Sequence, residues 1–264
     1  YVFLSCFLLS GCGMIDYHPY DVRISGETKV NAHNIERIEA NCQGKTTIRF
    51  VTMGDSQRWY DETEDFVKEI NKRNDIDFVI HGGDMSDFGL TKEFLWQRDI
   101  MNGLNVPYVV LIGNHDCLGT GAETYKAVFG PTNFSFIAGN VKFVCLNTNA
   151  LEYDYSEPVP NFTFMEQEIT SRLDEFEKTV ISMHARPYTD VFNDNVAKVF
   201  QHYIRQYPGI QVCTAAHTHH YQDDVIFDDG IHYVTSDCMD YRTYLVFTIT
   251  PEKYEYELVK YCLL

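Results

Sequence analysis

Basic side chains are scarce in this sequence. Lys and Arg together number 21, against 38 Asp and Glu, so the formal net charge is −17 over 264 residues. A field of that sign repels nucleic-acid backbones and anionic lipid surfaces, which excludes broad electrostatic binding to either. A small anion can bind only where something locally positive, such as a metal ion, reverses the field.

A membrane-spanning run is also missing. The apolar stretch Tyr1–Leu9 is much shorter than the roughly 20 residues that a spanning helix needs, and it is typical of a secretory signal. Leu9–Cys12 (LSGC) resembles the bacterial lipoprotein box, in which the Cys thiol carries the lipid; an ordinary signal with an incidental Cys12 is the alternative. We therefore expect a signal peptide over 1–11 and an exported protein, periplasmic or on the cell surface, that reaches the membrane only through a lipid anchor at Cys12.

Cys-x-x-Cys spacing is absent, so a structural thiolate zinc site has no support. With Cys6 and Cys12 in the signal, six of the 8 cysteines remain. Export permits disulfides, although six cysteines allow fifteen pairings and the sequence cannot choose among them. Cys145 and Cys213 lie inside apolar, strand-like runs and are expected to be buried thiols.

The remaining composition is that of a globular chain, with 45% hydrophobic and 22% charged residues. A chain of this length buries about three-quarters of its unfolded surface, so one compact domain is expected. We assign this domain to residues 46–264. Residues 12–45 are expected to form a tether and N-terminal extension, with a strand at Val22–Ile24 and a short helix at Ile35–Ile38.

From Thr46 onward, short apolar runs rich in β-branched residues alternate with amphipathic stretches, which is the pattern of βαβ units and predicts an α/β fold. The expected strands are Ile48–Met53, Phe78–His81, Tyr108–Ile112, Val141–Asn147, Thr179–Met183 and Ile210–Ala215. The expected helices are Asp61–Ile70, Thr91–Met101, Phe164–Phe176 and Val191–Arg205. After His219 the pattern changes to β-hairpin character, with strands at Val225–Phe227, Ile231–Val234, Tyr244–Thr250 and Tyr254–Val259. Glu152–Asn161 is expected to be an irregular loop.

Polar side chains follow almost every one of these strands. Asp55, Asp84 and Asn114 follow the first three strands at intervals of about thirty residues, the length of one βαβ unit. His184 and the segment Ala216–His219 follow two later strands. Because α/β sheets place their ligands at the carboxyl ends of strands, we expect these side chains to gather at one edge.

Five short segments in this order resemble the motifs of the calcineurin-like metallophosphoesterase family, whose patterns are D-x-H, G-D-x-x-D, G-N-H-(D/E), a lone H and G-H-x-H. Here they are Asp55–Gln57, Gly83–Asp87, Gly113–Asp116, His184 and Ala216–His219. The resemblance covers roughly residues 46–220. It implies a four-layer α/β/β/α sandwich of two mixed sheets, with a binuclear metal site at the C-terminal edge of the strands.

The resemblance also implies a ligand set for two divalent metal ions: manganese, iron or zinc. Asp84 would bridge the ions, because two cations a few ångströms apart need a shared carboxylate to offset their repulsion. Asp55 and His219 would complete the first site, and Asn114, His184 and His217 the second. A hydroxide that bridges the ions would attack phosphorus in line.

A general acid is implied as well. In the family the His of G-N-H stabilises the transition state or protonates the leaving oxygen, a role that falls to His115 here. The Asp of G-D-x-x-D holds that ring, so we expect Asp87 to hydrogen-bond His115. Asp116 is expected to lie behind the ligands.

The chain departs from the family pattern at three positions. Gln57 stands where the family has His, and it is interpreted as a tolerated metal ligand, a substrate-facing amide or a sign of lost activity. Ala216 replaces a Gly, which costs little unless the turn needs positive φ. Phe88 stands where relatives that act on phosphoproteins carry Arg, which argues against a phosphoprotein phosphatase.

Arg58 and Arg186 are the candidate substrate contacts, while Trp59 offers a ring face to substrate or packs in the core. Export, acidic charge and the motifs together predict metal-dependent hydrolysis of a small phosphomonoester or phosphodiester. The alternative is a metal-containing, surface-tethered binding protein whose turnover is lost or weak through Gln57. The expected partner is a small phosphorylated substrate and not a long nucleic acid, and the sequence leaves the oligomeric state open.

Overall fold

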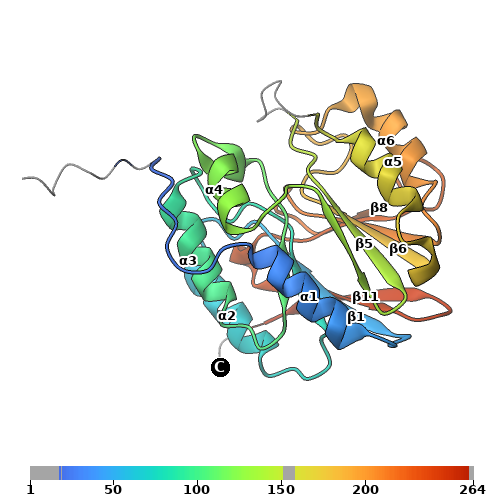
Figure 1. Cartoon of the computed structure of the whole chain (residues 1–264), viewed down its shortest axis with the longest axis horizontal. Helices are drawn as coiled ribbons and strands as arrows, with labels where there is room; N and C mark the ends of the chain where they lie inside the picture. Colours follow the sequence, from blue (N-terminus) through green and yellow to red (C-terminus); the bar gives the residue numbers. More distant parts are fainter. Residues whose placement is uncertain (1–17, 19, 151–157, 262–264) are drawn as a thin grey trace, which may run out of the picture.

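The computed structural model describes residues 18, 20–150 and 158–261. They form two mixed β-sheets packed face to face, with helices on the two outer sides (Figure 1). The predicted four-layer α/β/β/α sandwich is confirmed. The predicted signal, Cys12 and the larger part of the Glu152–Asn161 loop lie outside the described residues.

The first sheet has five strands in the order β11-β10-β1-β2-β3. The strand bounds are β1 Ile48–Met53, β2 Phe78–His81, β3 Tyr108–Val110, β10 Thr243–Ile249 and β11 Tyr254–Lys260. β1, β2 and β3 pair in parallel, whereas β10 and β11 pair antiparallel. The three parallel strands therefore end at the same edge of the sheet.

The second sheet has six strands in the order β4-β5-β6-β7-β9-β8. The strand bounds are β4 Phe134–Ala138, β5 Val141–Leu146, β6 Lys178–Met183, β7 Ile210–Ala215, β8 Gln222–Asp224 and β9 Tyr233–Thr235. β5, β6, β7 and β9 pair in parallel, and the edge strands β4 and β8 are antiparallel. Here too the parallel strands direct their carboxyl ends to one edge.

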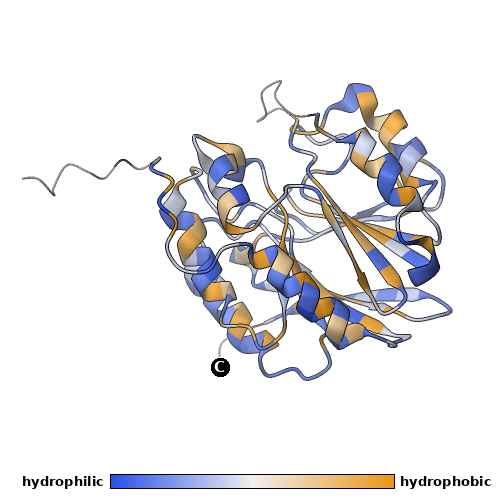
Figure 2. Cartoon of the chain, viewed as in Figure 1, coloured by the Kyte–Doolittle hydropathy of each residue, from blue (hydrophilic) through white to orange (hydrophobic). Residues whose placement is uncertain are grey.

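Side-chain alternation along the strands builds the apolar layers. In β1, Phe50 faces the other sheet while Val51 faces the helices, as the two-residue period of a strand requires. Between the sheets the ring of Phe143 meets those of Phe50 and Phe78 edge-on, with centroids 4.9 Å and 5.1 Å away. Figure 2 shows apolar residues along the strands and polar residues on the outer faces of the helices. This packing fixes how the two sheets sit against each other.

Helices cover both outer faces. α2 (Tyr60–Ile70), α3 (Thr91–Met101) and α4 (Gly121–Val128) pack on the first sheet, and α5 (Phe162–Thr170) and α6 (Ala197–Ile204) on the second (Figure 1). Short 3₁₀ turns complete the connections: η1 His115–Cys117, η2 Leu173–Glu175, η3 Asp194–Val196 and η4 Met239–Tyr241. In the described ranges, no helix is long and apolar enough to cross a membrane.

Helix α1 (Val30–Cys42) corrects the prediction of a tether that runs to residue 45. It lies against the edge strands β3 and β4, where Asn31 Nδ2 donates to the Val110 carbonyl and Asn31 Oδ1 accepts from the Val110 amide, both at 2.9 Å. Ile38 and Cys42 are fully buried among the residues between the sheets. Contacts with the domain begin before the helix, since Thr91 Oγ1 donates to the Asp21 carbonyl and Ile24 packs against the core of the first sheet, so the extension is part of the domain from Asp21 onward. Val22–Ile24, in contrast, forms no strand.

Several other element predictions need correction. β4 and α4 were not expected from the pattern, and the expected strand at Val225–Phe227 is replaced by β8, three residues earlier. The expected helices over 164–176 and 191–205 are each divided into an α-helix and a 3₁₀ turn. Cys145 and Cys213 are fully buried free thiols, as predicted.

Candidate metal centre

The site forms where strand ends from the two sheets converge. Gly54 after β1 and Gly82 after β2 approach Ala216 after β7 so closely that a Cβ on either glycine would lie 2.9 Å from the Ala216 Cβ. Glycine is therefore required at both positions. Ala216 is outside the positive-φ region, so it replaces the glycine of the family motif without backbone strain.

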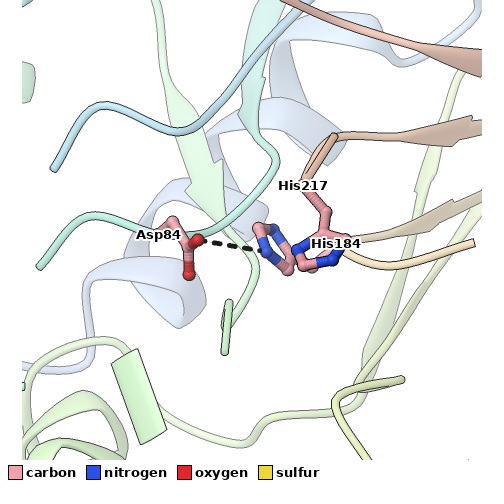
Figure 3. Close-up of side chains that lie close together, drawn as sticks. All are labelled: Asp84, His184 and His217. Atoms are coloured by element: carbon pink, nitrogen blue, oxygen red, sulfur yellow. Dashed lines mark ion pairs between the residues drawn. The ribbon is translucent and has the colours of Figure 1, made fainter. Parts of the chain in front are cut away.

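The six predicted ligands come half from each sheet: Asp55, Asp84 and Asn114 follow strands of the first, and His184, His217 and His219 follow strands of the second. The ligand atoms of Asp84, His184 and His217 lie within 4.8 Å of one another, and so do those of Asp55, Asp84 and His219. Figure 3 shows the Asp84 carboxylate beside the rings of His184 and His217. Asp84 is the member common to both clusters, as a bridging ligand would be.

The distances between side-chain atoms identify which ring nitrogens and oxygens of the candidate ligands lie close together. His184 Nε2 lies 3.3 Å from Asp84 Oδ2 and 3.0 Å from Asn114 Oδ1. His217 Nδ1 lies 3.0 Å from the same Asn114 oxygen. On the other side of Asp84, His219 Nε2 is 3.5 Å from Asp55 Oδ1.

Two buried oxygens that accept no hydrogen bond indicate that a cation fits at this site. Asp55 Oδ1 and Gln57 Oε1 are buried without a hydrogen-bond partner, and both residues are at most 1% exposed. Leaving such oxygens unsatisfied is costly unless a cation or ligand meets them. Gln57 Nε2 is 3.4 Å from Asp84 Oδ2, which places the amide beside the shared carboxylate. The residues present therefore suit a divalent cation.

The electrostatics of the centre also favour positive charge. Burial disfavours both charged forms of the Asp84–His184 pair, but their mutual attraction outweighs it. The pKa of Asp84 is lowered, and the pKa of His184 is raised to about 9. A proton is thus held where a metal would bind, so metal uptake must release it.

Four of the six candidate ligands have a strained backbone. Asp55, Asp84, His217 and His219 all have φ between 50° and 76°, in the left-handed region. For a residue with a Cβ this conformation costs about 1 kcal/mol or more. The surrounding structure holds these four ligands in place against that cost.

Asp116 lies behind the ligands, as expected. Its carboxylate accepts hydrogen bonds from the amides of Asp84 (2.9 Å), Ser86 (2.8 Å) and Gly113 (2.9 Å). Burial, with a further contribution from the Asp84 charge, raises the pKa of Asp116 to about 6. The residue therefore ties together the loops that carry Asp84 and Asn114.

His81, the last residue of β2, is a positioning residue that the sequence analysis missed. Its Nε2 lies 2.8 Å from Ser56 Oγ, and its Nδ1 accepts a hydrogen bond from the Gly83 amide at 3.2 Å. Burial lowers its pKa to about 3, so the ring stays neutral. His81 connects the turns that carry Asp55 and Asp84. The one feature of the sequence that could have indicated this role is its position at the end of a strand, directly before Gly82-Gly83-Asp84.

The predicted contact between Asp87 and His115 forms through a different atom. His115 Nδ1 donates to the backbone carbonyl of Asp87 at 2.8 Å, while the Asp87 carboxylate is 3.8 Å from that nitrogen. The carboxylate instead pairs with Arg58 at 2.5 Å, and this competition explains the difference. The bond at Nδ1 leaves Nε2 as the nitrogen that can face a leaving group.

The two candidate substrate arginines have different surroundings. Arg58 is exposed at the rim, where its guanidinium lies over the Trp59 ring, 5.8 Å from the centroid, and Trp59 meets the His219 ring edge-on. Arg186 is instead bound to β8, with Nη2 2.6 Å from Gln222 Oε1 and 2.8 Å from Asp224 Oδ2. Arg186 therefore connects its own loop to β8, whereas the exposed side chain of Arg58 is accessible at the rim of the site.

No curated protein matches the chain in sequence. Many solved structures share its fold, including these three. "GAP50 the anchor in the inner membrane complex of Plasmodium" has a TM-score of 0.61 and 11% identity, over 82% of this chain and 85% of that one. Purple acid phosphatase PPD1 from yellow lupin (Lupinus luteus) seeds has a TM-score of 0.60 and 14% identity, and the match covers 83% of this chain and 52% of that one. A dimetal phosphatase from Danio rerio has a TM-score of 0.57 and 11% identity, and the match covers 81% of this chain and 99% of that one.

These structural similarities show a common fold, and the match of the sequence to a family model shows the family. The profile of the calcineurin-like phosphoesterases matches residues 48–221, which is more than half of the chain and includes all five motifs. The protein belongs to the calcineurin-like phosphoesterase family.

Proposed function

We propose that the protein hydrolyses a small phosphoester with two divalent metal ions that share Asp84. The observation that carries this proposal is the pair of ligand clusters with Asp84 in common. The buried oxygens Asp55 Oδ1 and Gln57 Oε1 at the same place, which accept no hydrogen bond, support it. Carboxylate, amide and imidazole ligands suit manganese, iron or zinc.

The ligand clusters, His115 and Arg58 would each have a separate role in the reaction. Divalent ions held by the two clusters would activate water and neutralise charge on the phosphoryl oxygens. His115, held at Nδ1 by the Asp87 carbonyl, would donate a proton from Nε2 to the leaving oxygen. Arg58 would contact a phosphoryl oxygen from the rim, since its exposed guanidinium can exchange Asp87 for a substrate oxygen.

Gln57 fits this proposal as a weak ligand or as an amide that contacts substrate. Its Oε1 is buried beside Asp84, where an oxygen is useful to a cation. An amide oxygen is a poorer partner than imidazole for a transition metal, so we expect the ion bound by Asp55 and His219 to be the weaker of the two. The alternative of a binding protein without turnover is less favoured, because every other ligand position is filled and aligned.

Hydrolysis of p-nitrophenyl phosphate and of its bis ester, with manganese and after chelation, tests the function. We expect turnover that requires metal and falls at least a hundredfold in Asp84→Asn. Asp224→Asn is the matched control, because it removes an exposed carboxylate outside the ligand clusters. The ester that is preferred decides between a monoesterase and a diesterase. Silence on both esters from folded, metal-loaded protein would favour the binding-protein alternative.

Comparing the two arginines tests the substrate contact. Arg58→Ala should raise KM about tenfold, the equivalent of one charge-assisted hydrogen bond. Arg186→Ala should leave kcat/KM within about twofold, because its guanidinium is already bound to β8. Equal losses in both variants would contradict the assigned positions.

We also propose export with lipid attachment at Cys12, based on the LSGC segment. Expression in a bacterial host should give a membrane-fraction protein whose mass includes the lipid. Cys12→Ser should release it to the soluble exported fraction. Wild-type protein without lipid at Cys12 would leave the ordinary secretory signal as the better interpretation.

A further inference from the structure

The ring of His217 is held from the side opposite the ligand cluster. Its Nδ1 faces Asn114 Oδ1 at 3.0 Å, while its Nε2 lies 2.5 Å from Asp190 Oδ1. The two nitrogens of an imidazole point in different directions, so the nitrogen bound to Asp190 cannot serve the same ion as Nδ1. A proton on Nε2 makes Nδ1 the lone pair that faces inward.

Asp190 belongs to a loop with a defined shape. Thr189 Oγ1 donates to the Arg186 carbonyl at 2.8 Å, and the Ala150 amide donates to the Val191 carbonyl at 2.9 Å. The next two side chains, Val191 and Phe192, are buried. The Asp190 side chain itself is 85% exposed, so its contact with His217 comes from the loop and not from confinement in a core.

The second histidine of the same cluster is held in the same way. His184 faces Asn114 with Nε2 and contacts the Gly82 carbonyl with Nδ1 at 2.8 Å. Each of the two rings thus has an outward acceptor, a backbone carbonyl for His184 and a carboxylate for His217. Outer acceptors of this kind fix ring orientation and tautomer and raise the basicity of the ligand, and losing one typically costs 10–100-fold in metal affinity.

We propose that Asp190 is a positioning residue, which orients His217 and holds the tautomer that offers Nδ1 to the metal bound by Asp84, Asn114, His184 and His217. This inference rests on the proposed function. It assigns a task to a residue that lies outside the five motifs and outside both ligand clusters.

Calorimetric titration of the full, chelator-treated chain with Mn²⁺ provides the test. Asp190→Ala should lower the affinity for one of the two ions about 10–100-fold and leave the affinity for the other within about threefold of the wild-type value. Asp190→Asn should weaken it less, since its amide oxygen can still accept the Nε2 proton. Asp194→Ala is the matched control: Asp194 accepts the Tyr188 amide at 3.0 Å in the same loop and does not contact His217. We expect both of its affinities to equal those of the wild type.

A second readout follows the ring itself. Nitrogen-15 NMR of the metal-free protein should show His217 protonated at Nε2 in the wild type and a mixture of tautomers in Asp190→Ala. Wild-type affinities in Asp190→Ala would overturn the inference while leaving the proposed function intact. Equal weakening by Asp194→Ala would also overturn it, because the loop and not the hydrogen bond would then be responsible. A wild-type chain that takes up no Mn²⁺ would refute the metal-dependent function, and this inference with it.

Discussion

His81 should make the protein lose stability in mild acid. Burial lowers its pKa from the ordinary 6.5 to about 3, so the folded ring stays neutral while the unfolded chain takes up a proton below pH 6.5. The unfolded state therefore binds more protons between pH 6.5 and pH 3. The contribution of His81 to the free energy of unfolding is complete above pH 6.5 and is lost as the pH falls through that window.

The size of the effect follows from the same two values. A difference of about 3.5 units corresponds to about 5 kcal/mol in total, of which about 4 kcal/mol is lost by pH 3 and about 2 kcal/mol by pH 5. Gln is the best replacement, because its amide can donate to Ser56 Oγ and accept from the Gly83 amide, as the ring does. His81→Gln should remove this contribution to the pH dependence while retaining these two contacts.

Urea unfolding at pH 7.5 and pH 5.0, with chelator present throughout, measures the contribution of His81 to the free energy of unfolding. Between these two pH values the wild type should lose about 2 kcal/mol more of its free energy of unfolding than His81→Gln does. His202→Gln, a change at an exposed histidine of α6, should behave as the wild type. Equal losses in the wild type and in His81→Gln would refute the reasoning.

Three other substitutions test the frame around the site. Gly113→Ala places a Cβ 2.1 Å from Asp84 Oδ1 and 2.2 Å from the Asp84 amide, so it should displace the shared ligand and abolish Mn²⁺ binding in calorimetry. Phe143→Ala removes a ring from between the sheets and should lower the free energy of unfolding by about 3–5 kcal/mol in urea. Lys142→Met leaves the partly buried Glu168 without its cation; it should cost about 3 kcal/mol of stability while kcat stays unchanged, and a lower kcat would contradict the position of Lys142 outside the site.

The gathering of the candidate metal ligands was predictable because each residue obeys a local rule. Asp55, Asp84 and Asn114 each follow a parallel strand, and strand ends are determined by short apolar runs that the sequence displays directly. Helix α1 was largely missed because its buried face includes Asn31, which satisfies the backbone of β3 and so interrupts the apolar period. A polar residue in that role looks like solvent-facing sequence until the edge strand beside it is known.

The contacts behind the ligands could not be predicted in the same way. The Asp87 carboxylate chooses Arg58 over His115, and that choice depends on the relative position of two loops 29 residues apart in sequence. Asp190 follows no strand and matches no motif, and its approach to His217 is produced by hydrogen bonds within a loop. Sequence patterns carry periodicity and motif spacing, but they carry little information about which of several nearby partners a side chain selects.

The equal division of ligands between the two sheets has a consequence for assembly of the protein. Neither half of the chain contains a complete site, since the first sheet supplies oxygen ligands and the second supplies imidazoles. A growing or partly folded chain therefore has little affinity for metal until the sheets have met. A metal ion bound at the proposed site would then act as a clamp across the sandwich, and its binding energy would add to the stability of the finished fold alone. In a cell, metal content would distinguish completed molecules from unfinished ones.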